Sequence, residues 1–268
     1  MRRIMLTVAY DGTEYAGFQR QPGEVRTVEG ELDAAVSSVT GENIEVIGAS
    51  RTDAGVHARG NIAVFDTNSR IPAERFARAV NTRLPEDIRA VGSREVPADF
   101  HPRHAATEKT YEYRIVNADY PDPLKRRYAH YSYTPFDVEA MKAAALYFIG
   151  EHDFRSFCSI YTQSLTTVRT ITGIGVTASA EAMPREIVIT VTGTGFLYNM
   201  VRIIAGTLME VGRGAIAPER IPEIIGAMDR RAAGPTAPPQ GLTLAGYRFI
   251  GGIPDPSAVE LSEEVKTD

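Results

Sequence analysis

The sequence contains almost no cysteine and no long apolar segment. A single cysteine, Cys158, excludes an internal disulfide bond and is typical of proteins from a reducing compartment. No uninterrupted apolar run approaches the roughly 20 residues that a membrane-spanning helix needs. The first residues run directly into a strand pattern, without the apolar core of a signal peptide. We therefore expect a cytoplasmic protein without membrane association.

Metal-binding patterns are also missing. The chain has five histidines, and no set of cysteines or carboxylates accompanies them at the spacing of a metal site. His101 and His104 are three residues apart, but Pro102 between them prevents a regular helix face. We expect no metal site.

Positive charge is concentrated in the middle of the chain, although the 268 residues carry a net charge of −5. Residues 51–130 hold 14 basic and 11 acidic side chains, whereas residues 1–50 hold 4 and 8, and residues 131–268 hold 11 and 15. Arginine supplies 25 of the 29 cations, and its planar guanidinium suits phosphates and bases. A localised basic surface can bind RNA despite the negative total, although solvated helix faces would account for most of these arginines.

The hydrophobic periodicity predicts two similar α+β halves followed by a tail. The expected parts are residues 1–105, residues 106–250 and an acidic tail at 251–268. Strands are expected near 3–10, 43–49, 60–66, 87–96, 109–117, 126–134, 167–179, 186–194 and 242–249. Helices are expected from Thr27 to Gly41, from Pro72 to Leu84, and at 137–149, 197–212 and 218–228.

The loop at residues 48–58 (GASRTDAGVHA) has the composition of a reactive turn. It lies between two alternating apolar runs, which predicts strand, loop and strand with Asp53 in the turn. Arg51 places a guanidinium two residues from that carboxylate, and the pair suits an ionised nucleophile beside a group that grips a polyanion. On spacing alone, a plain turn with solvated Arg51 and His57 is the better explanation.

Five ordered segments resemble the tRNA pseudouridine synthase A family. Beside residues 51–58 (RTDAGVHA), which resemble its signature loop, they are 11–21 (DGTEYAGFQRQ), 27–32 (TVEGEL), 109–114 (KTYEYR), 195–206 (GFLYNMVRIIAG) and 241–244 (GLTL). The resemblance implies the pseudouridine synthase fold: two ferredoxin-like α/β halves that form a joined, mainly antiparallel sheet. Helices would cover one side of this sheet, and an active-site cleft would cross the other.

The resemblance also implies an activity, the isomerisation of uridine to pseudouridine at positions 38, 39 and 40 of the tRNA anticodon stem-loop. Asp53 would be the catalytic nucleophile, and Arg51 would fill the space left by the flipped base. Neither redox change nor hydrolysis takes place, so no cofactor or metal is expected. Family members form homodimers, and the expected partners are tRNA and a second copy of the chain.

Three further residues are candidates for substrate binding. Tyr111 and Tyr113 alternate on a predicted strand and face opposite sides of the sheet, and the family places its active-site tyrosine at Tyr111. Arg202 lies in an apolar helix, where its charge needs a partner: Asp53, Glu210 or a backbone carbonyl. Leu242 resembles the apolar residue beneath the target base, and a plain core position fits it nearly as well.

Two other classes of protein remain as alternatives. An RNA-binding protein without catalysis could stack bases on sheet aromatics, but no aromatic-rich strand of that kind is present. A phosphatase or glycosidase could use an aspartate nucleophile, but the loop of Asp53 carries no second acid for a metal or for glycoside chemistry.

Overall fold

A computed structural model of the protein describes residues 1–23, 25–162 and 164–253, in two compact units. The first unit contains Met1–Thr107 and the chain from Gly246 onwards, and the second contains Glu108–Ala245. Most of the predicted tail at 251–268 lies outside the described residues.

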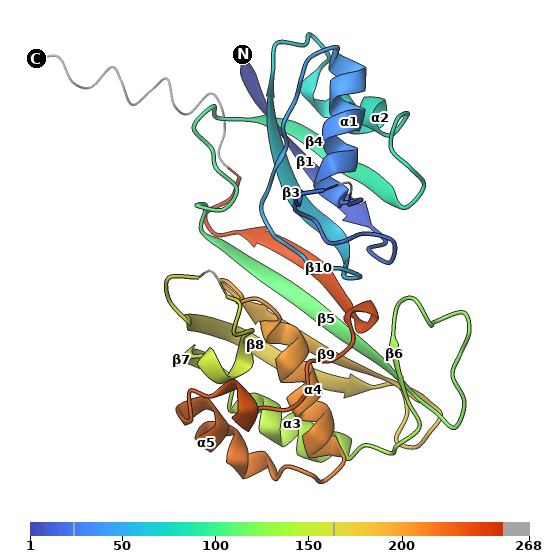
Figure 1. Cartoon of the computed structure of the whole chain (residues 1–268), viewed down its shortest axis with the longest axis vertical. Coiled ribbons are helices and arrows are strands. Elements are labelled where there is room, and N and C mark those ends of the chain that lie inside the picture. Colours follow the sequence, from blue (N-terminus) through green and yellow to red (C-terminus); the bar gives the residue numbers. More distant parts are fainter. Residues whose placement is uncertain (24, 163, 254–268) are drawn as a thin grey trace, which may run out of the picture. The chain divides into compact units, whose positions relative to one another are not determined.

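The first unit is a twisted antiparallel sheet with two helices. Its strands run in the order β4-β1-β3, and the short β2 pairs with β3. Helix α2 contacts both α1 and β4 (Figure 1). The elements are β1 (Arg2–Tyr10), α1 (Val28–Thr40), β2 (Ile47–Gly48), β3 (His57–Thr67), η1 (Ala73–Arg75), α2 (Phe76–Val80) and β4 (Ile88–Val96).

Helix α1 begins and ends where local capping signals predict. The side chain of Thr27 accepts a hydrogen bond from the Gly30 N–H at 3.2 Å, which satisfies one of the free donors at the helix start. Gly41 adopts the left-handed conformation with φ 72°, and its N–H donates to the Ser37 carbonyl at 2.9 Å. Both boundaries therefore follow from the sequence.

Glu29 and Asp33 are the buried acidic side chains of α1, and Asp33 has two polar partners. Its Oδ1 accepts a hydrogen bond from the Val46 N–H at 2.7 Å, and its Oδ2 pairs with Arg20. Burial raises the pKa of this carboxyl from 3.8 to about 6, against the opposing effects of Val46 and Arg20. The folded protein therefore binds this proton more tightly than the unfolded chain does.

The raised pKa of Asp33 predicts that the free energy of unfolding falls as the pH rises. The stability that its proton confers is fully present below about pH 4 and is lost as the pH rises through about 6. Asp33→Asn removes this titration but keeps an oxygen for Val46. Relative to the wild type, the variant should gain up to about 2 kcal/mol of unfolding free energy between pH 4 and pH 7. Urea unfolding of both proteins across this range measures the gain, and a constant difference would contradict the assignment.

The second unit repeats the combination of strands and helices. Its strands run in the order β5-β9-β8-β7, all antiparallel, and β6 pairs parallel with β5. Helix α3 contacts α4 and β8 (Figure 1). The elements are β5 (Thr107–Asn117), β6 (His130–Ser132), α3 (Val138–Leu146), β7 (Gly150–Asp153), η2 (Arg155–Phe157), β8 (Val168–Ala178), β9 (Arg185–Gly193), α4 (Met200–Gly212), η3 (Pro218–Arg220), α5 (Ile221–Gly226), η4 (Arg230–Ala232) and η5 (Pro239–Gly241).

Several elements differ from the sequence predictions. Strand β2 covers only Ile47–Gly48 of the expected 43–49, and α2 covers only Phe76–Val80 of the expected helix from Pro72 to Leu84. Helix α4 begins at Met200 rather than 197, because Asn199 takes a left-handed conformation with φ 63° that interrupts the helix. Strand β6 is limited to His130–Ser132, and β7 was not predicted. Most of its four residues are polar, so β7 lacks the apolar alternation that marks a strand.

The last strand, β10 (Leu242–Phe249), has the predicted bounds, and its residues are divided between the two units. In the first unit, Tyr247, Phe249 and Ile253 pack against a buried apolar cluster. That cluster consists of Met5, Ala49, Ile62, Val64, Val96 and Phe100. The described residues thus form mainly antiparallel strands with helices, and the predicted α+β class is confirmed.

No helix among the described residues is both long enough and apolar enough to cross a membrane.

Candidate active site

Asp53 lies in the loop between β2 and β3, as the strand-loop-strand pattern predicts. Its backbone carbonyl accepts a hydrogen bond from the Val56 N–H at 3.1 Å, which closes a tight turn. Asp53 is half-buried, Thr52 before it is buried, and Arg51 is exposed. The loop therefore presents the carboxylate and the guanidinium while its backbone is held in place.

A buried polar network supports this loop from below. Asn61 on β3 accepts a hydrogen bond from the Ser50 N–H at 3.2 Å and donates to the Ser50 carbonyl at 2.9 Å. It also donates to the Tyr10 hydroxyl at 3.2 Å, which in turn lies 2.7 Å from the hydroxyl of Thr52. Burial raises the pKa of Tyr10 well above its ordinary value, so the phenol stays neutral.

The chain from residue 11 to residue 18 holds the same loop from a second side. The Phe18 N–H donates to the Thr52 carbonyl at 3.1 Å, and the Gly55 N–H donates to the Tyr15 carbonyl at 3.3 Å. These two hydrogen bonds flank Asp53 in the sequence. The segments 11–21 and 51–58 therefore form one structural unit, with the first acting as a brace for the second.

His57 and Gly12 join the brace to the end of the loop. The Gly12 N–H donates to Nδ1 of His57 at 3.1 Å, and His57 is buried. A Cβ atom on Gly12 would lie 2.0 Å from the Val56 carbonyl oxygen, so only glycine fits there. The plain-turn alternative expects a solvated His57, and the burial of this residue contradicts it.

A second arginine, Arg103, lies beside Arg51. Its Nε donates to the Gly48 carbonyl at 2.8 Å, where the chain leaves β2 and enters the loop. Burial and the nearby charge of Arg51 lower the pKa of the Arg103 guanidinium. These two guanidinium groups repel each other, and an anion bound between them would be stabilised.

Tyr111 and Tyr113 on β5 differ in their surroundings. Tyr113 is fully buried, and its hydroxyl donates to the Pro238 carbonyl at 3.0 Å. Tyr111 is 8% exposed, and its ring contacts Phe196 edge to face with 5.2 Å between centroids. Tyr113 is therefore the core residue of this pair, and the assignment of Tyr111 to the substrate stays a prediction.

Arg202 lies in the first turn of α4, where it holds the chain near Ala237. Its Nε donates to the Ala237 carbonyl at 2.7 Å, and one Nη donates to Oδ1 of Asn199 at 2.8 Å. A backbone carbonyl is thus one of its partners. Glu210, another candidate, pairs instead with Arg213 at 2.6 Å. Pairing of Arg202 with Asp53 stays a prediction.

Leu242 is the first residue of β10 and is 5% exposed. Its burial agrees with a core position as well as with the predicted place beneath the target base.

Within the described ranges, no three histidine, cysteine or acidic side chains are grouped so that they could hold a metal ion.

Comparison with known proteins identifies the family. The family model described as tRNA pseudouridine synthase matches residues 6–104 and 144–249, a span that includes Asp53 with its supporting network, as well as Arg202 and Leu242. The fold and the loop thus define an RNA-modifying isomerase. The chain belongs to the tRNA pseudouridine synthase family, and it has the pseudouridine synthase fold that the resemblance implied.

Curated relatives with the same family description are similar in sequence over nearly the whole chain. The tRNA pseudouridine synthase A of Brevibacillus brevis is 49% identical over 244 residues, which cover 91% of this chain and 98% of that protein. The namesake from Caldicellulosiruptor bescii is 46% identical over 244 residues, with the same two coverages. A solved structure of a Cbf5–Nop10–Gar1 complex matches 77% of this chain and 54% of that chain, at 15% identity and a TM-score of 0.30.

Proposed function

We propose that this protein converts uridine to pseudouridine at positions 38, 39 and 40 of the tRNA anticodon stem-loop. The observation that carries the proposal is Asp53, a half-buried carboxylate on a loop braced from two sides. The reaction breaks the bond between the sugar and a uracil nitrogen and forms a bond from the same sugar carbon to a ring carbon. A fixed carboxylate nucleophile is the group that this exchange needs.

The other candidates supply binding. Arg51 is exposed beside Asp53 and would fill the space left when the target base leaves the stack. Tyr111 would stack on the detached uracil, and Leu242 would lie beneath it. Arg202 would keep the Asp53 carboxylate ionised through its charge.

The proposal also covers the substrate, the oligomeric state and the cellular compartment of the enzyme. The substrate is tRNA, and the active form is a homodimer that acts in the cytoplasm. The reaction balances without oxidant, reductant or water, so it uses neither a cofactor nor a metal ion.

The test is incubation of the purified protein with an unmodified tRNA transcript in the presence of a chelator. The expected product is pseudouridine in the anticodon arm at undiminished transcript length. Binding without any modified base would favour the RNA-binding alternative. Release of free uracil or inorganic phosphate would favour a hydrolase.

Arg202→Met should move the acid limb of the kcat profile to higher pH by about one unit. The reason is that an opposite charge nearby lowers the pKa of a carboxyl by about that amount or more. Single-turnover rates from pH 5 to pH 8 give the apparent pKa of the acid limb for the wild type and the variant.

The matched control is Arg213→Met, which removes a guanidinium from the other end of α4. It should leave the limb in place. If the acid limb of Arg202→Met does not move, the charge of Arg202 does not keep Asp53 ionised. Its role would then be structural, through contacts such as those with Ala237 and Asn199, and the substitution would lower only the free energy of unfolding.

A further inference from the structure

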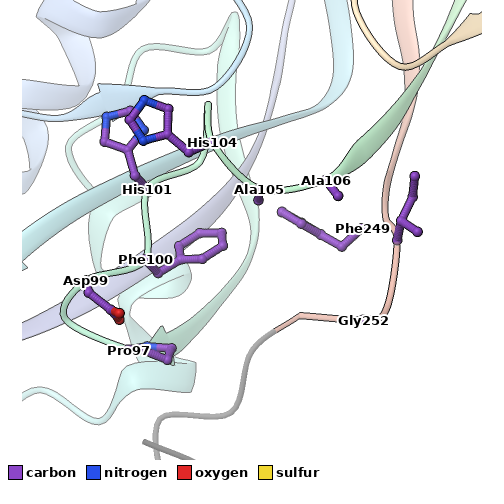
Figure 2. Close-up of a pocket in the computed structure, with 10 residues that line it drawn as sticks. Pro97, Asp99, Phe100, His101, His104, Ala105, Ala106, Phe249 and Gly252 are labelled. Atoms are coloured by element: carbon purple, nitrogen blue, oxygen red, sulfur yellow. The ribbon is translucent and has the colours of Figure 1, made fainter.

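A cavity of about 400 Å³ lies in the first unit, where the chain leaves β4 (Figure 2). Its lining comes from two segments, residues 97–106 and residues 249–252. Phe100 and Phe249 form its apolar part, with 5.8 Å between ring centroids. This volume is within the range of small-molecule sites, which are mostly apolar with a few polar groups.

Two stacked histidines, His101 and His104, belong to the lining of this cavity. The rings of His101 and His104 lie 4.1 Å apart between centroids at an interplanar angle of 21°. The His101 carbonyl accepts hydrogen bonds from the N–H groups of His104 and Ala105, so the backbone fixes the stack. His104 is exposed, and its ring makes no hydrogen bond within the described part of the chain.

The pKa of the His101 ring lies below its ordinary value, which favours the neutral form of this ring at pH 7. Burial lowers the pKa of His101, and the charges of His104, Arg103 and Arg3 lower it further. The exposed imidazole of His104 presents an aromatic face, and unpaired nucleobases stack on such faces in RNA-binding proteins.

Arg103 connects this cavity to the nucleophile loop. It lies between the two histidines in the sequence, and its N–H donates to Nδ1 of His101 at 3.3 Å. Its guanidinium is held on the Gly48 carbonyl and interacts with the charge of Arg51. A strand of RNA that reaches Arg51 therefore has a second cation within reach, on the side of the histidines.

We propose that the cavity and the His101–His104 stack form a second RNA subsite, which takes one unpaired nucleotide of the substrate beside the target uridine. The base stacks on His104 and enters toward Phe100 and Phe249, and its phosphate lies on Arg103. Asp99 in the lining would repel a phosphate and can accept a hydrogen bond from a base N–H, which sets this orientation. The subsite rests on the proposed function, because it needs an RNA substrate at Asp53.

The experiment compares His104→Ala with His104→Phe, and uses His152→Ala as the matched control. His152 is a half-exposed histidine of the second unit that packs edge to face on Phe154 at 5.7 Å. The probe is an unmodified tRNA transcript. KM and kcat are measured for each variant, and Kd is measured in an Asp53→Asn background.

We expect KM and Kd to rise about tenfold in His104→Ala with kcat unchanged, which is the usual cost of losing one base–aromatic stack. His104→Phe should recover both to within about twofold, because it keeps the aromatic face. The control should leave both constants unchanged. Arg103→Gln should reduce the slope of log Kd against log salt by about one, as expected for one lost phosphate contact.

Unchanged Kd in His104→Ala would overturn the subsite, and so would a Phe variant as weak as the Ala variant while both unfold at the wild-type temperature. A wild-type protein that forms no pseudouridine would overturn the proposed function instead. In that case the Kd values still decide whether the histidines bind RNA.

Discussion

Asp53→Asn should abolish pseudouridine formation, with a fall in kcat on the order of 10⁴-fold or more, as is typical when an enzyme loses its nucleophile. The amide has the same shape as the carboxylate but does not attack. The loop should survive the change, because the turn is closed by the Asp53 backbone carbonyl and not by its side chain. Loss of a negative charge should leave tRNA affinity unchanged or slightly higher.

Single-turnover assays and a thermal melt of the variant check both parts of this prediction. Asp229→Asn is the matched control, since Asp229 is a half-exposed partner of Arg231 in the second unit. It should keep kcat within about twofold. Turnover at the wild-type rate in Asp53→Asn would remove Asp53 from the mechanism.

Gly12→Ala should damage both stability and activity. The new Cβ would lie 2.0 Å from the Val56 carbonyl oxygen, and that atom belongs to the backbone and cannot rotate away. Either the brace or the nucleophile loop must move, at a cost of about 3 kcal/mol in unfolding free energy. Because the loop carries Asp53, a displaced loop should also lower kcat.

Gly175→Ala provides the control for this substitution. Gly175 lies in β8, and a Cβ atom built there meets no atom within 4 Å. That variant should be as stable as the wild type or slightly more stable, because alanine loses less conformational entropy than glycine on folding. If both variants unfold at the same denaturant concentration, the brace is looser than its geometry indicates.

The elements that could be predicted from the sequence are those with local signals. Helix α1 carries its own caps, Thr27 and Gly41, and β10 begins directly after a segment rich in proline and glycine. The missed features depend on conformation or on distant partners. Asn199 takes a left-handed conformation that its type permits but does not require, and β7 forms because β8 offers it a hydrogen-bonding edge.

The candidate site likewise contains residues that a local motif predicts and residues that depend on distant partners. Asp53 and Arg51 were predictable because a contiguous motif carries them. Tyr10, Asn61 and Arg103 were not, because each meets the loop across a separation that the pattern of a single chain does not reveal. An asparagine at the start of the apolar run 61–65 is the one signal that could have drawn attention to the network.

The division of β10 between the two units affects the order in which the units fold. The first unit is interrupted in the sequence by the whole of Glu108–Ala245. On the ribosome, its apolar cluster must wait for Tyr247 and Phe249 while that long segment is synthesised. At ordinary elongation rates the delay is on the order of ten seconds, long compared with the folding of most small domains. The second unit can therefore complete its fold first, and the half that carries the nucleophile is finished last.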